Sequence, residues 1–538
     1  MIIKSQNVFT GNSNKPEPLS LLIHGEKIKA VLPYHYDPDL YPGEAVRDYE
    51  DRLIMPSFID AHTHIISGAV SESDYVCNTL GECKSQEECV ERMKEFAHTH
   101  PELHRLRGTG WFVGAWEDAP LPDKRSLDEA FPETPVYLQC ADAHSMWMNS
   151  AAIREAGYTE EFTVENGEAC RFSDGSLSGL FLEPAACEPA MKKYMEFSQE
   201  EMKEIHVSFQ KKLASYGIAA VSEMFAEDYT EENKKSYEIL KNLDQENQLN
   251  SEIFVFTKMF GYTDFTPFFE FQKELNTKHF HIAGVKGFLD GVTETYTGLL
   301  LEPYEDRKET CGEGLPLWPK EKMQKEIIAA NRAGISVRLH CIADGSVRMA
   351  LDMFEEAKKQ LPDCPNLRNT IEHIENIHPS DLNRFRELKV IPSMQPYHVT
   401  LSNNGKIWRL GKERCKYEFP VRSVYEAAGE VAIGTDFPVV SVNPFLTIYA
   451  ALTRLNDEGK EVCQNGEEQK LPVDVVLKSY TQTGAKVYGV EEQTGTLEAG
   501  KLANFIVLSK NPFAVSPEEF RSARVLANYF EGSEVYYE

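Results

Sequence analysis

Short apolar runs alternate with amphipathic helical stretches through the middle of this chain. Helical patterns such as QEECVERMKEFAH (86–98) and EEMKEIHVSFQKKLASYG (200–217) lie between runs of strand length. This alternation predicts a parallel sheet, because each parallel strand needs a crossover connection. We count eight such strands, at 53–64, 134–144, 217–224, 282–291, 334–345, 369–377, 390–396 and 430–439. Eight strands with crossover helices fit a (β/α)8 barrel, whose active site lies at the C-terminal ends of the strands.

The two ends of the chain have a different pattern. Residues 1–54 and 486–538 contain short β-like runs separated by turns, with His24-Gly25-Glu26 as one bend. Two β-rich ends around one long middle predict that the termini pair into a small composite β-sandwich domain. The catalytic barrel would then cover 55–485. Two stretches of it, around 65–133 and 145–200, exceed normal βα loops and are predicted insertions over the site.

The charge balance excludes some classes of partner. Lys and Arg total 56 against 85 Asp and Glu, which gives a formal net charge of −29. Such a surface repels phosphate backbones and anionic lipids, so we expect neither a nucleic acid nor a membrane as partner. No apolar run reaches transmembrane length, no signal-peptide pattern is present, and the 11 Cys residues form no C-x-x-C pair. We therefore expect a cytoplasmic protein with reduced thiols.

Two H-x-H tripeptides occur in different contexts. His62-Thr63-His64 ends an apolar strand, where the period of two places both imidazoles on one face. His98-Thr99-His100 ends an amphipathic helical pattern just before Pro101, where the two imidazoles face different directions. We interpret the second copy as a helix C-terminus, which favours cationic side chains. The first copy is the candidate for chemistry.

Residues of metal-binding type lie on four more predicted strands. Lys286 lies on 282–291, His340 and His373 lie on the next two strands, and Asp436 closes the last one. In a barrel these positions share one rim. Imidazoles and carboxylates together suit zinc or a similar divalent ion, so the sequence predicts a metal site at that rim.

These segments resemble the amidohydrolase superfamily, in particular its amidohydro-3, YtcJ-like branch. The matching segments run in family order from about residue 45 to 510, and they are MPSFIDAHTH (55–64), PVYLQCADAHSMWMNSAAI (135–153), VKGFLDG (285–291), VRLHCIADGSV (337–347), IEHIENI (371–377), SMQP (393–396), IGTDFPV (433–439) and GTLEAGKLANFIVL (495–508). The resemblance implies a metal-dependent hydrolase barrel with a composite β domain built from both termini.

The resemblance also implies two divalent metal ions, with zinc as the expected metal. By position, His62, His64 and Asp436 would hold the more buried ion, and His340 and His373 the second. Lys286 would bridge both ions as a lysine carboxylated by CO₂. Its apolar strand would lower its pKa by desolvation, which this modification requires. The alternative is an ordinary lysine paired with Asp290.

The predicted reaction is metal-assisted hydrolysis of a non-peptide C–N bond of the amide type. Asp436 would take a proton from the attacking water and then give it to the leaving amine. His144 is the second catalytic candidate, as a hydrogen-bond partner of the reacting group. The alternative for His144 is a buried histidine bonded to Asp142.

The substrate is predicted to be a small aromatic or apolar N-acyl or N-formyl amine. Trp111, Trp116 and Trp147 lie in segments expected to approach the rim, and aromatic walls suit flat or apolar ligands, although tryptophan is commoner in cores. Glu183 matches a family position and Phe437 replaces the family's usual tryptophan, so both are further candidates for the pocket.

Three alternatives stay open at this point. The first is a cyclic-amide hydrolase or an aminohydrolase of the same superfamily. The second is a mononuclear site with uncarboxylated Lys286, in which Cys140 would lie near the metal. The third is a non-catalytic metal- or ligand-binding barrel. Relatives of this architecture are often homodimers, and no residue of this sequence indicates an interface.

Overall fold

The computed structural model describes residues 1–113, 116, 121–141, 145–164, 167–309, 312–364, 367–401 and 405–538. These residues form two compact units. The first comprises Met1–Ile65 and Gln210–Glu538, and the second comprises Ile66–Phe209. Apart from residue 65, both predicted insertions lie in the second unit, which also contains the segment 134–144 between them.

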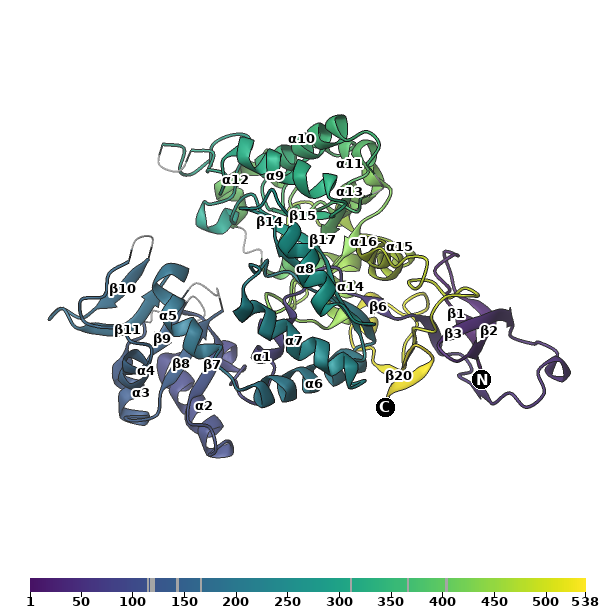
Figure 1. The fold of residues 1–538 in the computed structure, drawn as a ribbon, viewed down its shortest axis with the longest axis horizontal. Helices are drawn as coiled ribbons and strands as arrows, with labels where there is room; N and C mark the ends of the chain where they lie inside the picture. The colour runs from purple at the N-terminus through teal and green to yellow at the C-terminus, as the bar shows by residue number, and fades with distance from the viewer. Residues whose placement is uncertain are drawn as a thin grey trace. The chain divides into compact units, whose positions relative to one another are not determined.

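Eight parallel strands form the central sheet of the first unit (Figure 1). In spatial order, which is also chain order, they are β6 (Phe58–Ile59), β12 (Ile218–Glu223), β13 (Glu252–Lys258), β14 (Phe280–Phe288), β15 (Val337–Cys341), β16 (Thr370–His373), β17 (Ile391–Met394) and β18 (Ala432–Ile433). Every residue of β12 and of β16 is buried. Burial on both faces is typical of parallel strands covered by helices, and it explains their continuous apolar runs.

Backbone hydrogen bonds also join the segment that follows the edge strand β6 to the other edge strand, β18, and to the segment after β18. The N–H of Ala61 donates to the C=O of Ile433 at 3.1 Å, and the N–H of Asp436 donates to the C=O of His62 at 2.7 Å. These bonds bring the first and last strands of the sheet together. As a result, His64 and Asp436 are neighbours although 372 positions separate them in the chain.

One strand predicted for this sheet is wrong, and another was missed. The segment 134–144 contains β8 (Val136–Cys140), which pairs with β7 (Leu106–Trp111) and β9 (Ser145–Met148) in a sheet of the second unit. β8 resembles a barrel strand because it is largely buried and pairs in parallel with β7. The missed strand is β13, which ends in Lys258 and carries neither histidine nor carboxylate at its C-terminal end. Lys286 nevertheless stays on the fourth strand.

Helices connect successive strands of the first unit and cover its sheet (Figure 1). The connecting helices are α7 (Glu231–Gln245), α8 (Thr266–Leu275), α9 (Lys320–Arg332), α10 (Asp344–Gln360), α11 (Arg384–Leu388), α12 (Gly405–Cys415) and α13 (Val421–Ala428). Three more helices follow the last strand, β18, and they are α14 (Pro444–Thr453), α15 (Val473–Lys478) and α16 (Gly484–Tyr488). α10 shows why they form: Val347, Leu351 and Phe354 recur at helical spacing and are buried. α6 (Gln199–Ser215) confirms the predicted helix at 200–217.

Both chain ends contribute to one mixed eight-stranded sheet of the first unit. Its strands are β1 (Ile2–Val8), β2 (Glu17–His24), β3 (Lys27–Pro33), β4 (Val46–Asp48), β5 (Leu53–Pro56), β19 (Phe505–Leu508), β20 (Val525–Phe530) and β21 (Ser533–Tyr537). β5 pairs antiparallel with β19, so the N- and C-terminal strands meet inside the sheet. The predicted bend is confirmed, because Gly25, with φ of 58°, separates β2 from β3.

The second unit has its own five-stranded sheet, in the order β10-β11-β9-β8-β7. Its other elements are β10 (Glu168–Arg171), β11 (Leu177–Leu182), α1 (Ile65–Ser71, whose first residue belongs to the first unit), α2 (Gln86–Thr99), α3 (Lys124–Ala130), α4 (Ser150–Glu155) and α5 (Pro184–Tyr194). α2 confirms the interpretation of the second H-x-H: His98 lies in its last turn and His100 is its C-cap.

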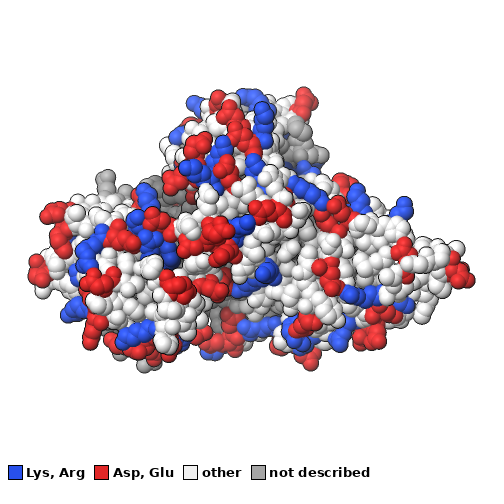
Figure 2. Space-filling view, turned by 60° about the horizontal axis from the view of Figure 1, so that its bottom comes forward, with Lys and Arg blue, Asp and Glu red and all other residues white. Residues whose placement is uncertain are grey.

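The surface carries charges of both signs. In the view of Figure 2, carboxylate side chains are numerous and Lys and Arg side chains lie among them. Within the described residues, no helix has the length and apolar character needed to cross a membrane.

Candidate metal centre

Asp60 fixes the backbone on both sides of the predicted site. Its carboxylate accepts hydrogen bonds from the N–H of Thr435 at 3.0 Å, the hydroxyl of Thr435 at 2.7 Å and the N–H of His62 at 3.2 Å. Complete burial raises the pKa of Asp60 to about 7. These bonds hold the segment that carries His62 against the segment that carries Asp436.

The histidine pair, the lysine and the aspartate meet at one point. Asp436 Oδ1 lies 3.0 Å from His64 Nε2 and 3.4 Å from His62 Nε2. Lys286 Nζ lies 3.4 Å from the same His62 Nε2. His62 and Lys286 are buried, whereas the side chain of His64 keeps 18% of its exposure. The two imidazoles of the first H-x-H therefore contact the same carboxylate. The strand predicted at 53–64 is wrong in its bounds, because it divides into β5 and β6 in two different sheets and both histidines follow β6, which ends at Ile59.

His340 and His373 lie beside this group. Their rings are 4.5 Å apart, and the ring of His373 is 4.8 Å from that of His62. His373 Nδ1 lies 3.8 Å from Asp436 Oδ2. The structure thus brings together all six residues predicted as metal ligands. His373 and Asp436 have left-handed backbone, with φ of 74° and 60°. Such backbone strain at non-glycine residues is a recurrent feature of functional sites.

The protonation states of these residues suit a metal. Burial, followed by the charge of Lys286, lowers the pKa of His62 to about 3 and that of His340 to about 4. Burial also lowers the pKa of Lys286 to about 8. Burial alone would raise the pKa of Asp436, but His62 and His64 hold it well below its usual value. The cluster therefore offers neutral imidazoles and an ionised carboxylate, the forms that bind divalent ions.

Three of these residues have the spacing for a shared ion. His62, His373 and Asp436 each offer one ligand atom, and the three atoms lie within 4.8 Å of one another. This donor set of nitrogen and oxygen atoms suits zinc and similar divalent ions. The residues present therefore fit the metal that the sequence predicts.

A buried carboxylate orients His62. Glu372 Oε2 lies 2.7 Å from His62 Nδ1, and Glu372 Oε1 accepts a hydrogen bond from Arg338 Nε at 2.8 Å. All three side chains are almost completely buried. Because Nδ1 is engaged by Glu372, Nε2 is the nitrogen that faces Lys286 and Asp436. Metal-binding histidines are commonly held by a carboxylate in this way.

Four further polar residues at this site were missed by the sequence analysis. Gln395 Oε1 lies 2.9 Å from His373 Nδ1, and His398 Nε2 lies 3.7 Å from Asp436 Oδ2. His398 Nδ1 faces Glu375 Oε1 at 3.5 Å, and Lys406 pairs with the other oxygen of Glu375. Burial would raise the pKa of Glu375, but Lys406 lowers it to about 2. The sequence did contain a signal for two of them. The segment 390–396 was predicted as a barrel strand without a site residue at its end, and Gln395 and His398 lie at that end.

The other predicted residues lie elsewhere or outside the described part. His144 lies outside the described residues. Trp111, Trp116 and Trp147 are buried in the core of the second unit, where Trp111 Nε1 donates to the C=O of Leu138. This location gives their predicted pocket role no support. The final three residues are Glu183, which is exposed in the second unit, Cys140, which is buried in its core, and Phe437, which is buried beside Asp436 in the first unit.

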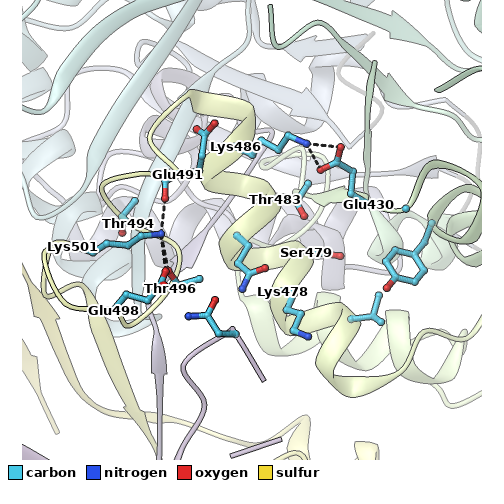
Figure 3. Close-up of a pocket in the computed structure, with 15 residues that line it drawn as sticks. Glu430, Lys478, Ser479, Thr483, Lys486, Glu491, Thr494, Thr496, Glu498 and Lys501 are labelled. Atoms are coloured by element: carbon cyan, nitrogen blue, oxygen red, sulfur yellow. Dashed lines mark hydrogen bonds and ion pairs between the residues drawn. The ribbon is translucent and has the colours of Figure 1, made fainter. Parts of the chain in front are cut away.

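A cavity of about 400 Å³ lies beside α15, η8 (Ser479–Thr483) and α16 (Figure 3). Its charged lining residues are Glu430, Lys478, Lys486, Glu491, Glu498 and Lys501. Lys486 pairs with Glu430 at 2.7 Å, and Lys501 donates to the hydroxyl of Thr496 at 2.7 Å (Figure 3). None of its lining residues belongs to the histidine cluster, so this cavity is a different place from the metal centre.

Comparisons with known proteins agree with this geometry. Residues 45–536 match the amidohydrolase family Amidohydro_3. Curated relatives include Protein LONG AFTER FAR-RED 3 of Arabidopsis thaliana, which is 26% identical over 100% of this chain and 91% of that protein. Another is the putative amidohydrolase YtcJ of Bacillus subtilis, which is 24% identical over 90% of this chain and 89% of that protein. An N-substituted formamide deformylase of Arthrobacter pascens is 22% identical over 99% of this chain and 97% of its own.

Solved structures show the same fold. An uncharacterized metal-dependent hydrolase of Pyrococcus horikoshii superposes with a TM-score of 0.78 and 23% identity, covering 96% of this chain and 99% of that one. An uncharacterized metal-dependent hydrolase of Pyrococcus furiosus superposes with a TM-score of 0.74 and 25% identity, covering 95% of this chain and 100% of that one. Fold and site together define a metal-dependent hydrolase. The chain belongs to the amidohydrolase family, and it is an enzyme that acts on carbon–nitrogen bonds other than peptide bonds.

Proposed function

We propose that the enzyme hydrolyses the amide-type C–N bond of a small N-acyl or N-formyl amine with an aromatic or apolar substituent. The observation that carries this proposal is the contact of Asp436 with both histidines of the first H-x-H, at 3.0 and 3.4 Å. An ionised carboxylate among neutral imidazoles is suited to move a proton at a metal centre. The similarity to an N-substituted formamide deformylase along almost the full length of both chains supports the substrate class.

The proposed metal centre holds two divalent ions, with zinc as the expected metal. His62, His64 and Asp436 would hold one ion, and His340 and His373 the other. Lys286, carboxylated by CO₂, would bind both, which is supported by its burial and its lowered pKa of about 8. When bound, such ions polarise a carbonyl and lower the pKa of water.

The residues of the chain supply the proton transfers. Asp436 is ionised and faces the site with both oxygens, because Oδ1 contacts His64 and Oδ2 lies 3.7 to 3.8 Å from His398 and His373. Its carboxylate takes a proton from the attacking water while the C–O bond forms. It then gives that proton to the nitrogen as the C–N bond breaks, so the amine leaves as a neutral molecule.

The proposal includes the finer architecture. The eight parallel strands would form a closed (β/α)8 barrel, supported by the hydrogen bonds of Ala61 and Asp436 to residues beside the opposite edge strand. The sheet from the two chain ends would be the composite β-sandwich domain of such hydrolases. The site would then open at the C-terminal ends of the barrel strands.

Metal analysis and a substrate panel test the proposal. Protein purified without chelator should contain about two divalent ions per chain. It should hydrolyse N-formyl or N-acyl amines faster than cyclic amides or amino-substituted heterocycles. A folded protein with far less metal after growth in supplemented medium would contradict the metal centre. Preference for a cyclic amide, or release of ammonia from a heterocycle, would replace the proposed substrate class.

A further inference from the structure

Two buried side chains at the end of β17 have polar atoms that the site described above leaves unused. Gln395 Nε2 and His398 Nε2 are both shielded from solvent, and neither has a hydrogen-bond partner among the described residues. Gln395 and His398 are each about 3% exposed. A buried polar atom without a partner lowers stability, because it has lost its hydrogen bonds to water, so such atoms at a catalytic centre indicate a missing ligand.

The orientation of Gln395 is set by His373. Gln395 Oε1 lies 2.9 Å from His373 Nδ1, so the oxygen of the amide is the atom turned to the imidazole, which donates. The NH₂ group of Gln395 is therefore the unpartnered end. An amide NH₂ can only donate hydrogen bonds, so the atom it lacks is an acceptor.

The hydrogen-bonding role of His398 is set by Glu375. His398 Nδ1 faces Glu375 Oε1 at 3.5 Å, and the ion pair of Glu375 with Lys406 keeps that carboxylate an acceptor. In the neutral imidazole Nδ1 therefore carries the proton, and Nε2 is left as an acceptor. His398 Nε2 lies 3.7 Å from Asp436 Oδ2, and its ring lies parallel to that of His373 at 6.2 Å. Both unpartnered atoms thus belong to side chains that contact His373 or Asp436.

We propose that these two side chains bind the reacting amide group of the substrate: the NH₂ of Gln395 donates to the substrate's carbonyl oxygen, and His398 Nε2 accepts from the substrate's N–H. The site would then select secondary amides, which carry an N–H on the scissile nitrogen, over N,N-disubstituted amides. This inference rests on the proposed function and narrows its substrate class. A site that hydrogen-bonds a substrate group discriminates strongly against analogues without it, because its buried polar atom is left unpaired.

The geometry also agrees with the proton transfer. A scissile nitrogen whose N–H is bound by His398 Nε2 lies close to Asp436 Oδ2, since these two atoms are neighbours. The carboxylate that carries the proton of water would therefore face the nitrogen that must receive it. His398 would act as a substrate-binding residue in this step.

A pair of substrates tests the inference. The two compounds are N-(2-phenylethyl)formamide and its N-methyl derivative, which lacks the N–H. We expect the parent enzyme to prefer the first by about 10- to 100-fold in kcat/KM, the equivalent of one buried hydrogen bond. In His398→Ala this ratio should fall to near one, because only the secondary amide loses a contact. In Gln395→Ala both compounds should lose activity by similar factors, because both have the carbonyl.

Controls separate this role from metal binding and from folding. His378→Ala removes an exposed histidine of the same unit and should leave the ratio unchanged. His398→Leu keeps the buried volume and replaces the alanine variant where that variant does not fold. Metal content measured on each variant should match the parent. Loss of metal in the His398 variants would make His398 a ligand and overturn the inference.

Three kinetic results would contradict the inference, and one of them would also contradict the proposed function. Equal kcat/KM for both formamides in the parent enzyme would overturn the inference while the proposed function stands. An unchanged preference in a folded, metal-loaded His398 variant would do the same. If the parent hydrolyses no N-formyl or N-acyl amine at all, the proposed function fails and this inference fails with it.

Discussion

Glu372 Oε2 lies 2.7 Å from His62 Nδ1, and this contact fixes which nitrogen of His62 faces the metal centre. Arg338 compensates the charge of Glu372 through Nε at 2.8 Å and also donates to the C=O of Ala61. The guanidinium on β15 thus supports both the carboxylate that orients His62 and the backbone of the residue before His62. This arrangement makes Glu372 a positioning residue for the proposed ligand.

Glu372→Gln should weaken metal binding by about 10- to 100-fold, the usual effect of losing such a support. The amide can still contact His62, but it no longer balances the buried Arg338. The measurement is the metal retained against a series of chelator concentrations. Glu321→Gln, at an exposed position of α9, is the control. Full metal retention in Glu372→Gln would show that His62 needs no carboxylate to hold it.

Acid should destabilise the metal-free enzyme through His62. Burial lowers the pKa of His62 from an ordinary 6.5 to about 3, so between these values the unfolded chain binds a proton that the folded chain does not. The free energy of unfolding therefore decreases as pH falls from about 6.5 toward 3, by at most about 1.4 kcal/mol per pH unit for one group.

The check is the denaturant midpoint of chelated protein across this pH range. His62→Gln removes one titrating group and should make the curve shallower, while His340, whose pKa is lowered to about 4, still contributes. His378→Gln, which changes an exposed histidine, should leave its slope unchanged. A His62→Gln curve as steep as that of the parent would assign the acid sensitivity to other groups.

The sequence predicts the parallel sheet well and one of its strands wrongly, for a physical reason. Apolar runs that end in polar residues locate β14, β15, β16 and β18, because burial on two faces and a functional rim both leave a pattern. The pattern does not say which sheet a buried run joins. β8 has the same composition but pairs with β7 in the second unit, while β13 lacks a marked end residue.

The candidate site divides in the same way. Residues at strand ends, such as His340 and His373, follow from periodicity and position alone. Residues that act by contacting another side chain cannot be predicted in this way, because the contacted residue is distant in the chain. Lys406 lies on α12, 31 positions after the Glu375 that it pairs with, and only the folded structure connects Glu375 to His398.

The second H-x-H, His98-Thr99-His100, has the same three residue types as the first and provides a control for the metal-binding role of His62 and His64. His98→Ala combined with His100→Ala should leave turnover within a few-fold of the parent. His98 lies in the last turn of α2, and His100 Nδ1 lies 2.9 Å from the C=O of Phe96, so both belong to a helix end. His62→Ala measured in parallel should lose metal. Loss of metal from the double variant, with retention in His62→Ala, would reverse the assignment of the two tripeptides.

Asp436→Asn separates the ligand role of this residue from its role as proton acceptor. The amide keeps the shape and one oxygen for the metal, but it cannot take a proton from water. General acid–base assistance contributes about 10²–10⁴ in rate, so turnover should fall by that factor. Metal content, by elemental analysis, should fall only in part, because His62 and His373 still offer ligand atoms beside position 436.

Near-parental turnover with full metal would remove Asp436 from the proton transfer. His398, whose Nε2 lies 3.7 Å from Asp436 Oδ2, would then be the acceptor to test. Complete loss of metal would show that the carboxylate charge is essential to hold the ion, and the kinetics of that variant would then report binding. We expect metal to remain and hydrolysis to be lost, because the neighbouring imidazoles can retain an ion but none of them replaces an ionised carboxylate between His64 and the reacting group.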